Sequence, residues 1–410
     1  MKSAVLIVLT LMACTALAQP PAGSATVPIT LDHNRIIIDV YLPLPDGNTK
    51  RVRGWVDSGD PDFWLSEDAA KLMGLELTGE PQDLGSLKYR MAKPPASIRV
   101  GKMDVPLTGI KEARVLLGSD SVARGMSAEI NLPSTVLRNY DVLVNYPDRE
   151  FTLAAPGTLH FQGQQSKMLV NADNGLAQVP AKIEGKSYNL GLDVGSSISF
   201  IFADVLDPLL QSHPQWPRMT GAVGNANMWG SEEEPKWQLA RLPRVQYGPV
   251  FLTDIAVVEF PKQASDWFEK RAGMKTAGLL GANALLPYRV GLDYKHQAAY
   301  FEIGMTFKAP DFDVIGLILR PEIDGRYIVV GIADYQGKPS VEGVQPGDQL
   351  ISVNGIRATG GTMGQAWSSL EGNPGQERTL IIDRAGKQIE VKATVQHFLA
   401  VPEDSKKLKK

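Results

Sequence analysis

The stretch VRGWVDSG at residues 52–59 decides the fold, because it reads as a β-strand that ends in an aspartate and a glycine. It follows the apolar run 35–42 across a Pro-Asp-Gly turn, so the whole segment predicts a β-hairpin that delivers Asp57 to a loop. A second predicted hairpin, 178–192, also leads directly into an Asp-x-Gly triplet, at Asp193. The two aspartates lie 136 residues apart, which suggests that one structural unit occurs twice.

Repetition extends beyond the two aspartates. The motif IRVG at 98–101 matches VQYG at 245–248 with an offset of 147 residues. Apolar and aromatic positions in 132–146 match those in 280–294 with an offset of 148 residues. Three blocks in the same order indicate a duplicated, mainly β unit with an insertion in the second copy. The predicted boundaries of the two units are 27–156 and 157–306.

The composition is that of an ordinary globular chain, and it excludes several functional classes. The 410 residues suffice for two to three domains. With 42 Lys and Arg against 45 Asp and Glu, the net charge of −3 gives no basic footprint for nucleic acid, and we expect no nucleic-acid partner. A single cysteine, Cys14, and five scattered histidines offer no metal-ligand spacing, so we expect neither a metal nor another cofactor.

The N-terminus has the pattern of an export signal. Residues 1–18 combine a positive start, a short apolar stretch and an Ala-Leu-Ala cleavage pattern, which predicts a signal peptide removed after Ala18. The alternative is a lipoprotein signal of residues 1–13, because LMAC at 11–14 resembles a lipobox and would make Cys14 the lipidated residue. Both alternatives export the protein. We expect a periplasmic location, with an outer-membrane lipoprotein or a secreted form as alternatives, and membrane association only if Cys14 is lipidated.

The last hundred residues have a different pattern. The string GVQPGDQLISVNG at 343–355 resembles PDZ domains of the bacterial protease type, and the resemblance covers residues 310–400. It implies that an extended C-terminal peptide adds to a sheet edge while a loop holds its carboxylate. The residues of that loop would be Ile315, Gly316, Leu317 and Ile318. Alternatively, this edge packs against the rest of the chain and binds no free peptide.

The two aspartate loops resemble those of pepsin- and retropepsin-type aspartic proteases. In that family each lobe supplies one aspartate from a D-[ST]-G triplet and, later, a hydrophobic-hydrophobic-Gly segment. Here the matching segments are DSG at 57–59 and LLG at 279–281, and the resemblance covers residues 27–306. It implies a mainly β fold with two retropepsin-like β-barrel lobes, followed by the PDZ domain. It also implies that Asp57 and Asp193 form a catalytic dyad that acts on peptide or protein substrates.

Several further residues would serve this dyad. Glycine allows a tight turn behind each carboxylate, and a hydroxyl can brace the paired loops. The supporting residues are Ser58, Gly59, Val194, Gly195 and Ser196. Two aromatic residues in loop-like segments, Tyr89 and Trp229, are candidates for flaps that contact substrate. Because the duplication supplies both halves of the site, we expect a monomer.

The chain departs from the family at two positions close to the dyad. Val194 stands where the family has Ser or Thr, so the brace between the loops loses one hydroxyl. Asp60 adds a third carboxylate, which would raise the pKa values of the dyad or mark a loop that no longer catalyses. Two hypotheses therefore remain open. One is an exported aspartic endopeptidase whose PDZ domain recruits substrate or partner peptides. The other is a catalytically lapsed homologue that acts as a peptide-binding or scaffold protein.

Overall fold

The structure, a computed structural model, describes residues 23–84, 87–304 and 312–400. It is mainly β, with 48% of residues in strands and 13% in helices, which confirms the predicted fold class at that level. The predicted signal peptide and Cys14 lie outside the described residues. We call residues 24–154 the first unit, 164–303 the second unit and 312–400 the C-terminal unit.

A ten-stranded sheet in the first unit carries Asp57. Its strands are β2 (Thr30–Asp32), β3 (Arg35–Pro43), β4 (Thr49–Asp57), β5 (Trp64–Ser66), β6 (Leu77–Leu84), β7 (Leu87–Ala92), β8 (Ser97–Val100), β9 (Met103–Pro106), β10 (Ala113–Leu116) and β11 (Ile130–Pro133). The order is β6-β7-β10-β5-β11-β4-β3-β8-β9, with β2 paired to β3. The predicted hairpin is formed by β3 and β4, where Ile36, Ile38 and Val40 are fully buried on the core face. Two short helices, α1 (Glu67–Leu72) and α2 (Ser134–Leu137), follow β5 and β11.

An eight-stranded sheet in the second unit leads to Asp193. Its strands are β15 (Leu169–Val170), β16 (Ala177–Ile183), β17 (Lys186–Leu192), β18 (Ser199–Phe202), β19 (Arg218–Thr220), β20 (Gln238–Tyr247), β21 (Val250–Phe260) and β22 (Gly278–Leu280). The order is β15-β16-β17-β22-β18-β21-β20-β19, and β16 also pairs with β20. The helices are α3 (Ala203–Ser212), α4 (Lys262–Ala272), α5 (Ala282–Leu285) and the 3₁₀ turns η1 (Gly224–Ala226) and η2 (Glu234–Lys236).

Both units place their aspartate by the same strand pairing. In the first unit, β11 runs parallel to β4, with Pro133 opposite Asp57, and antiparallel to β5. In the second unit, β22 runs parallel to β17, with Leu280 opposite Leu192, and antiparallel to β18. Each aspartate therefore follows a strand that is hydrogen-bonded to the middle strand of a three-strand arrangement. This arrangement fixes the backbone that enters each loop.

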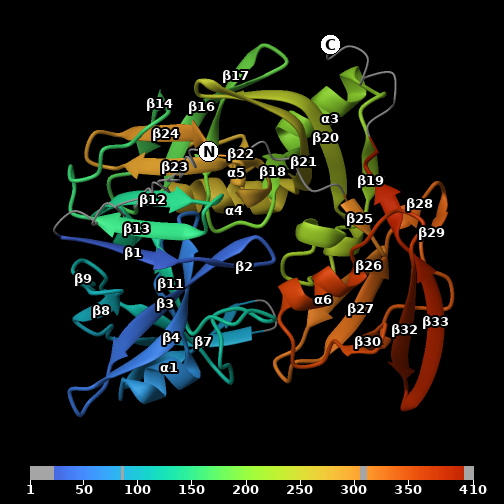
Figure 1. Cartoon of the computed structure of the whole chain (residues 1–410), viewed down its shortest axis with the longest axis horizontal. Helices are drawn as coiled ribbons and strands as arrows, with labels where there is room; N and C mark the ends of the chain where they lie inside the picture. Colours follow the sequence, from blue (N-terminus) through green and yellow to red (C-terminus); the bar gives the residue numbers. More distant parts are fainter. Residues whose placement is uncertain (1–22, 85–86, 305–311, 401–410) are drawn as a thin grey trace, which may run out of the picture.

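A six-stranded sheet joins the two units. Its strands are β1 (Ser24–Pro28), β12 (Asp141–Asn145), β13 (Glu150–Ala154), β14 (Gln164–Lys167), β23 (Tyr288–Asp293) and β24 (Ala298–Ile303), in the order β1-β13-β12-β23-β24-β14. The central pair, β12 with β23, comes from the two different units and is antiparallel. In Figure 1 the rest of the first unit, in blue and cyan, lies below this sheet, and the rest of the second unit lies mostly to its right and above it.

The C-terminal unit is a small sheet with one helix. Its strands are β25 (Phe312–Val314), β26 (Leu317–Pro321), β27 (Tyr327–Ile332), β28 (Asp334–Tyr335), β29 (Lys338–Pro339), β30 (Gln349–Val353), β31 (Ile356–Arg357), β32 (Glu377–Arg384), β33 (Lys387–Thr394) and β34 (Gln396–Phe398). The main sheet has the order β26-β27-β30-β32-β33, so β26 is an edge strand. The helix α6 (Met363–Leu370) begins at a capping box formed by Thr362 and Gln365.

The core of the C-terminal unit is continuous with that of the second unit. One hydrophobic cluster contains Leu317 and Trp367 of the C-terminal unit together with Phe200 and Met228 of the second. The orange and red strands in Figure 1 therefore belong to a unit packed onto the rest of the chain. None of the helices within the described ranges is long and apolar enough to cross a bilayer.

Candidate functional site

The structure brings the two predicted aspartates together. Asp57 ends β4 and Asp193 directly follows β17, and each lies against the glycine of the other loop. A Cβ atom built on Gly59 would overlap the Asp193 carboxylate, and one built on Gly195 would lie 2.8 Å from Asp57 Oδ1. Glycine is therefore required at both positions by the close approach of the opposite loop. Only 3% of Asp57 and 8% of Asp193 is exposed.

Backbone amides orient both carboxylates. The N–H of Gly59 donates to Asp57 Oδ1 over 3.1 Å. On the other loop, the N–H groups of Gly195 and Ser196 donate to Asp193 Oδ1 over 2.8 and 3.2 Å. The predicted supporting residue Ser196 thus acts through its backbone, while its hydroxyl donates to the Ile198 carbonyl over 2.7 Å. Each carboxylate is held in a fixed direction by its own loop.

Ser58 connects the two loops. Its hydroxyl donates to the Leu192 carbonyl over 2.9 Å and accepts from the Val194 N–H over 3.0 Å. Val194 has no hydroxyl to return this contact, and its side chain is fully buried in the core. The brace therefore has one hydroxyl, and this side chain bonds to the backbone on both sides of Asp193.

Two aromatic side chains of the first unit support the Val194 side of the site. Trp55 Nε1 donates to the Gly195 carbonyl over 3.1 Å, and the Tyr146 hydroxyl donates to the Val194 carbonyl over 3.2 Å. Sequence reasoning missed both residues. Trp55 had a usable signal, because it lies two residues before Asp57 on an alternating strand and so shares its face. These bonds hold the second loop without a second hydroxyl.

Ser58→Ala is expected to lower the free energy of unfolding by about 1–3 kcal/mol, because it leaves the buried Val194 N–H without an acceptor. Urea denaturation with an unchanged slope would measure this loss. The matched control is Ser212→Ala, whose exposed hydroxyl donates only to the Pro208 carbonyl one turn earlier. That control should shift stability by less than about 0.5 kcal/mol. Equal effects of the two substitutions would contradict a bracing role for Ser58.

Burial and mutual repulsion shift the titration of the pair. Burial raises the pKa of Asp57 well above its usual range, and the negative charges of Asp193 and Asp60 raise it further. Burial also raises the pKa of Asp193 to about 6. The hydrogen bonds from the backbone N–H groups of Gly195 and Ser196 act in the opposite direction and lower this pKa. Two buried carboxyls that repel each other cannot both ionise easily, so the pair keeps one proton from acidic solution up to about pH 6.

The third carboxylate, Asp60, takes part in an ion-pair network. Arg271, on α4 of the second unit, contacts both Asp60 and Asp62. Within the first unit, Arg114 pairs with Asp62 over 2.9 Å, and Trp64 Nε1 donates to Asp60 Oδ2 over 3.2 Å. The extra charge beside the dyad is thus matched by a guanidinium. Sequence reasoning missed both arginines, since Arg271 lies 211 residues from Asp60.

A small cavity adjoins Asp193. Its volume is about 20 Å³, which is room for a single water molecule. The aspartate loops contribute Ser58, Gly59 and Asp193 to its lining. The segment of α4 and the residue pair after it contributes Phe268, Ala272 and Met274. The space beside Asp193 therefore holds the water of a hydrolysis but not a peptide.

The two predicted flap residues have different positions. Tyr89 lies on β7 with its hydroxyl donating to Gln82 over 2.6 Å, and its ring meets Trp64 edge-on at 5.4 Å. Through Trp64 it is connected to Asp60. Trp229 is 45% exposed and stacks on Phe200. It does not line the cavity beside Asp193.

The segment around Trp229 instead covers the edge of β26. Asn227 Oδ1 accepts from the Leu319 N–H of β26 over 2.7 Å. A Cβ on Gly230 would lie 2.9 Å from Arg320 Cβ and 2.7 Å from the Leu319 carbonyl. The loop-like glycine therefore serves a close backbone approach. The predicted peptide-binding residues Ile315, Leu317 and Ile318 have fully buried side chains, and Gly316 lies against Ser340 and Phe398.

A buried carboxylate, Glu234, folds this covering segment. It accepts from the backbone N–H groups of Trp229 and Gly230 over 2.8 and 3.1 Å, and from the Asn227 side chain. Burial raises the pKa of Glu234 to about 7. From the first unit, the buried Arg35 donates to the Met228 carbonyl over 2.5 Å. The segment is thus fixed by three units at once.

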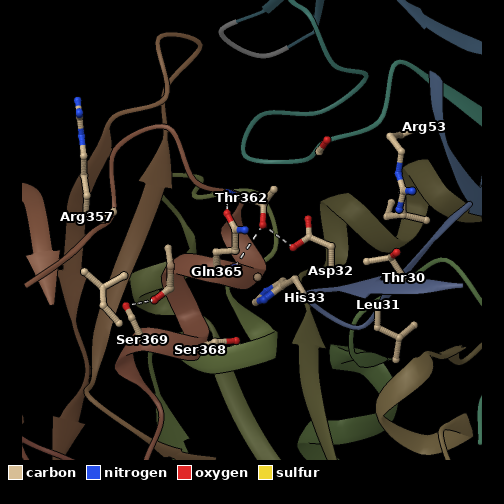
Figure 2. Close-up of a pocket in the computed structure, with 16 residues that line it drawn as sticks. Thr30, Leu31, Asp32, His33, Arg53, Arg357, Thr362, Gln365, Ser368 and Ser369 are labelled. Atoms are coloured by element: carbon tan, nitrogen blue, oxygen red, sulfur yellow. Dashed lines mark hydrogen bonds between the residues drawn. The ribbon is translucent and has the colours of Figure 1, made fainter. Parts of the chain in front are cut away.

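A larger cavity, of about 800 Å³, lies between the first unit and α6 (Figure 2). Thr30, Asp32 and Arg53 line it from the first unit, and Thr362 and Ser369 line it from the C-terminal unit. Thr362 Oγ1 donates to Asp32 over 2.6 Å, as the dashed line in Figure 2 shows. None of its lining residues belongs to the aspartate loops, so it is not the entrance to the dyad.

Within the described residues, no three His, Cys, Asp or Glu side chains form a cluster that could hold a metal ion. No protein-family model matches the chain, and no curated protein sequence matches it either.

Proposed function

We propose that the chain is an aspartic endopeptidase whose two related units resemble the lobes of retropepsin-type proteases. The observation that carries the proposal is the meeting of Asp57 and Asp193, each pressed against the glycine of the opposite loop and almost fully buried. Burying two carboxylates side by side is costly, and sites where pKa values are shifted in this way are usually functional. A lapsed homologue has no evident reason to keep this arrangement.

The proposed mechanism needs one shared proton and one water. The ionised member of the pair takes a proton from the water, whose oxygen attacks the scissile carbonyl carbon, while the protonated member donates its proton to the carbonyl oxygen. The gem-diol intermediate then returns one hydroxyl proton to the ionised aspartate as the C–N bond breaks, and the leaving amine takes a proton from the other aspartate, so the pair again holds one proton. The raised pKa values of Asp57 and Asp193 favour the singly protonated state.

For the C-terminal unit we propose a PDZ-like fold that packs against the second unit and stabilises it. The edge of β26, which such a domain would offer to an extended peptide, is in contact with Asn227 and Gly230. This contact favours the alternative in which the edge packs against the rest of the chain over the recruitment of free C-terminal peptides. It also weakens the scaffold hypothesis, which depends on an open edge. We further propose export, on the pattern of residues 1–18.

The test is cleavage of a mixed peptide library between pH 3 and 8, read by mass spectrometry in ¹⁸O-labelled water. Direct attack by water predicts one labelled oxygen in each new carboxyl terminus and no covalent peptide–enzyme adduct. We expect activity on the acidic side of neutrality, where the pair keeps its proton. No cleavage anywhere in this range, or trapping of an acyl-enzyme, would reject the proposal.

A further inference from the structure

We propose that α4 is a built-in lid, and that the contacts of Arg271 with Asp60 and Asp62 hold it closed over the dyad. This inference rests on the proposed function, because it concerns access to the same site. It goes further in stating that the described state is closed and that peptide entry requires α4 to move. Three observations support it.

The first observation is the size of the space beside Asp193. Peptide and ligand sites enclose about 300–1,000 Å³, whereas this cavity has about 20 Å³. Its lining includes Phe268 and Ala272 of α4 and Met274 just beyond the helix, together with residues of β16, β17 and β22. A substrate backbone that approaches Asp193 from this side must displace these residues.

The second observation is the weak anchoring of α4. Of the side chains described in this helix, only Ser265 and Ala272 are buried, and Trp267 is 57% exposed. A helix with so few buried apolar contacts is a low-stability element that can open locally without global unfolding. Its anchors are Phe268, half-buried and edge-on to Phe202 of β18, and two asparagines at its end. The side chains of Asn171 and Asn174 donate to the carbonyls of Ala272 and Arg271 over 2.6 and 3.2 Å, respectively.

The third observation is the direction of the ion pairs. Arg271 belongs to the second unit, while Asp60 and Asp62 follow Asp57 in the first, so these contacts join α4 to the loop that carries Asp57. The three side chains are 20%, 26% and 24% exposed, so solvent screens them only in part. Arg114 also pairs with Asp62, but both belong to the first unit. Among these charged contacts, the cross-unit ones can act as a latch.

The experiment compares Arg271→Gln with Arg114→Gln in the full chain. Each variant removes one guanidinium from Asp62, but only Arg271→Gln removes an ion pair that joins the two units. Amide hydrogen exchange over residues 262–274 reports lid opening without any need for catalysis. We expect exchange there to accelerate by about fivefold or more in Arg271→Gln, with no change in Arg114→Gln. High salt should accelerate it in the parent chain and much less in Arg271→Gln.

Peptide cleavage is measured in parallel. An open lid is expected to raise kcat/KM of Arg271→Gln by a similar factor. Unchanged exchange over 262–274 in Arg271→Gln would overturn the lid even if the parent chain cleaves peptides. Faster exchange without cleavage in any variant would support the lid and reject the endopeptidase. The two failures are therefore distinguishable. If Arg271→Gln does not fold, the salt dependence of exchange in the parent chain decides the question alone.

Discussion

Asp57→Asn and Asp193→Asn are each expected to lower kcat/KM for peptide cleavage by about 10²–10⁴-fold. An amide cannot take a proton from water, and it cannot hold the proton that the pair shares. Both variants should keep the fold, since asparagine has nearly the same shape and removes a buried charge. The double variant should be little worse than either single one, because the two carboxyls act as a unit. Steady-state kinetics on one cleaved library peptide measure all three.

The matched control for these variants is Asp32→Asn. Asp32 is also an aspartate whose pKa is raised by burial, but it lies at the junction with α6, hydrogen-bonded to Thr362. The kcat/KM of the Asp32→Asn variant should equal that of the parent chain. Retained cleavage in either dyad variant, or an equal loss in the control, would show that the hydrolysis occurs elsewhere.

The free energy of unfolding is expected to rise by roughly 3 kcal/mol as the pH is lowered from 7 to 5. The pKa of Asp193 is about 6 and that of Glu234 about 7, both raised by burial, and the pKa of Asp57 is also raised well above its usual range. The folded state therefore keeps protons that the unfolded chain loses near pH 4. Stability is lost as the pH rises through the folded pKa values.

One buried group opposes this trend. Burial lowers the pKa of His33 to about 3. Below about pH 6.5 the unfolded chain therefore binds a proton at this histidine, whereas the folded chain does not. His33 faces the Asn227 carbonyl and lies near Arg35 and Trp367. Its contribution destabilises the fold on acidification, but three raised carboxyls outweigh one histidine.

Denaturant titrations at several pH values measure the balance between these groups. In Asp193→Asn, the free energy of unfolding should depend less on pH between pH 4 and 6. The contribution of Glu234 to this dependence, between about pH 4.5 and 7, should remain. A parent chain whose stability increases steadily from pH 5 to 7 would contradict the burial of ionisable carboxyls at these positions.

The placement of the two aspartates could be predicted from local sequence. Each sits in an Asp-x-Gly triplet after a hairpin, and the repeat offsets indicated that the two hairpins hold equivalent positions. The apolar alternation in 35–42 predicted the register that buries Ile36 and Ile38. These are short-range signals, because a strand and its turn are encoded within about ten residues.

The support around the dyad could not be predicted in the same way. Arg271 reaches Asp60 across 211 residues, and Tyr146 reaches Val194 across 48. No local pattern marks such pairs. The sequence predicts Trp229 and its loop-like segment as a candidate flap, but Gly230 in this segment is needed for contact with β26. A glycine that permits motion and one that permits close packing look the same in sequence.

The central strand pair of the sheet that joins the units suggests how the asymmetry of the dyad arose. Leu143 pairs with Gly291, which lies 148 residues further along, the same offset that relates the later repeat blocks. Asp141 pairs with Asp293, which is the equivalent of Asn145 in the second copy, and Asn145 pairs with Arg289, which is the equivalent of Asp141. The strand pair therefore has an approximate two-fold axis through its middle. A single ancestral unit would expose an edge complementary to its own copy and could close into a symmetric dimer. When two copies are joined in one chain, their sequences no longer have to be identical. One aspartate loop can then keep a serine, Ser58, while the equivalent position of the other loop is a valine, Val194.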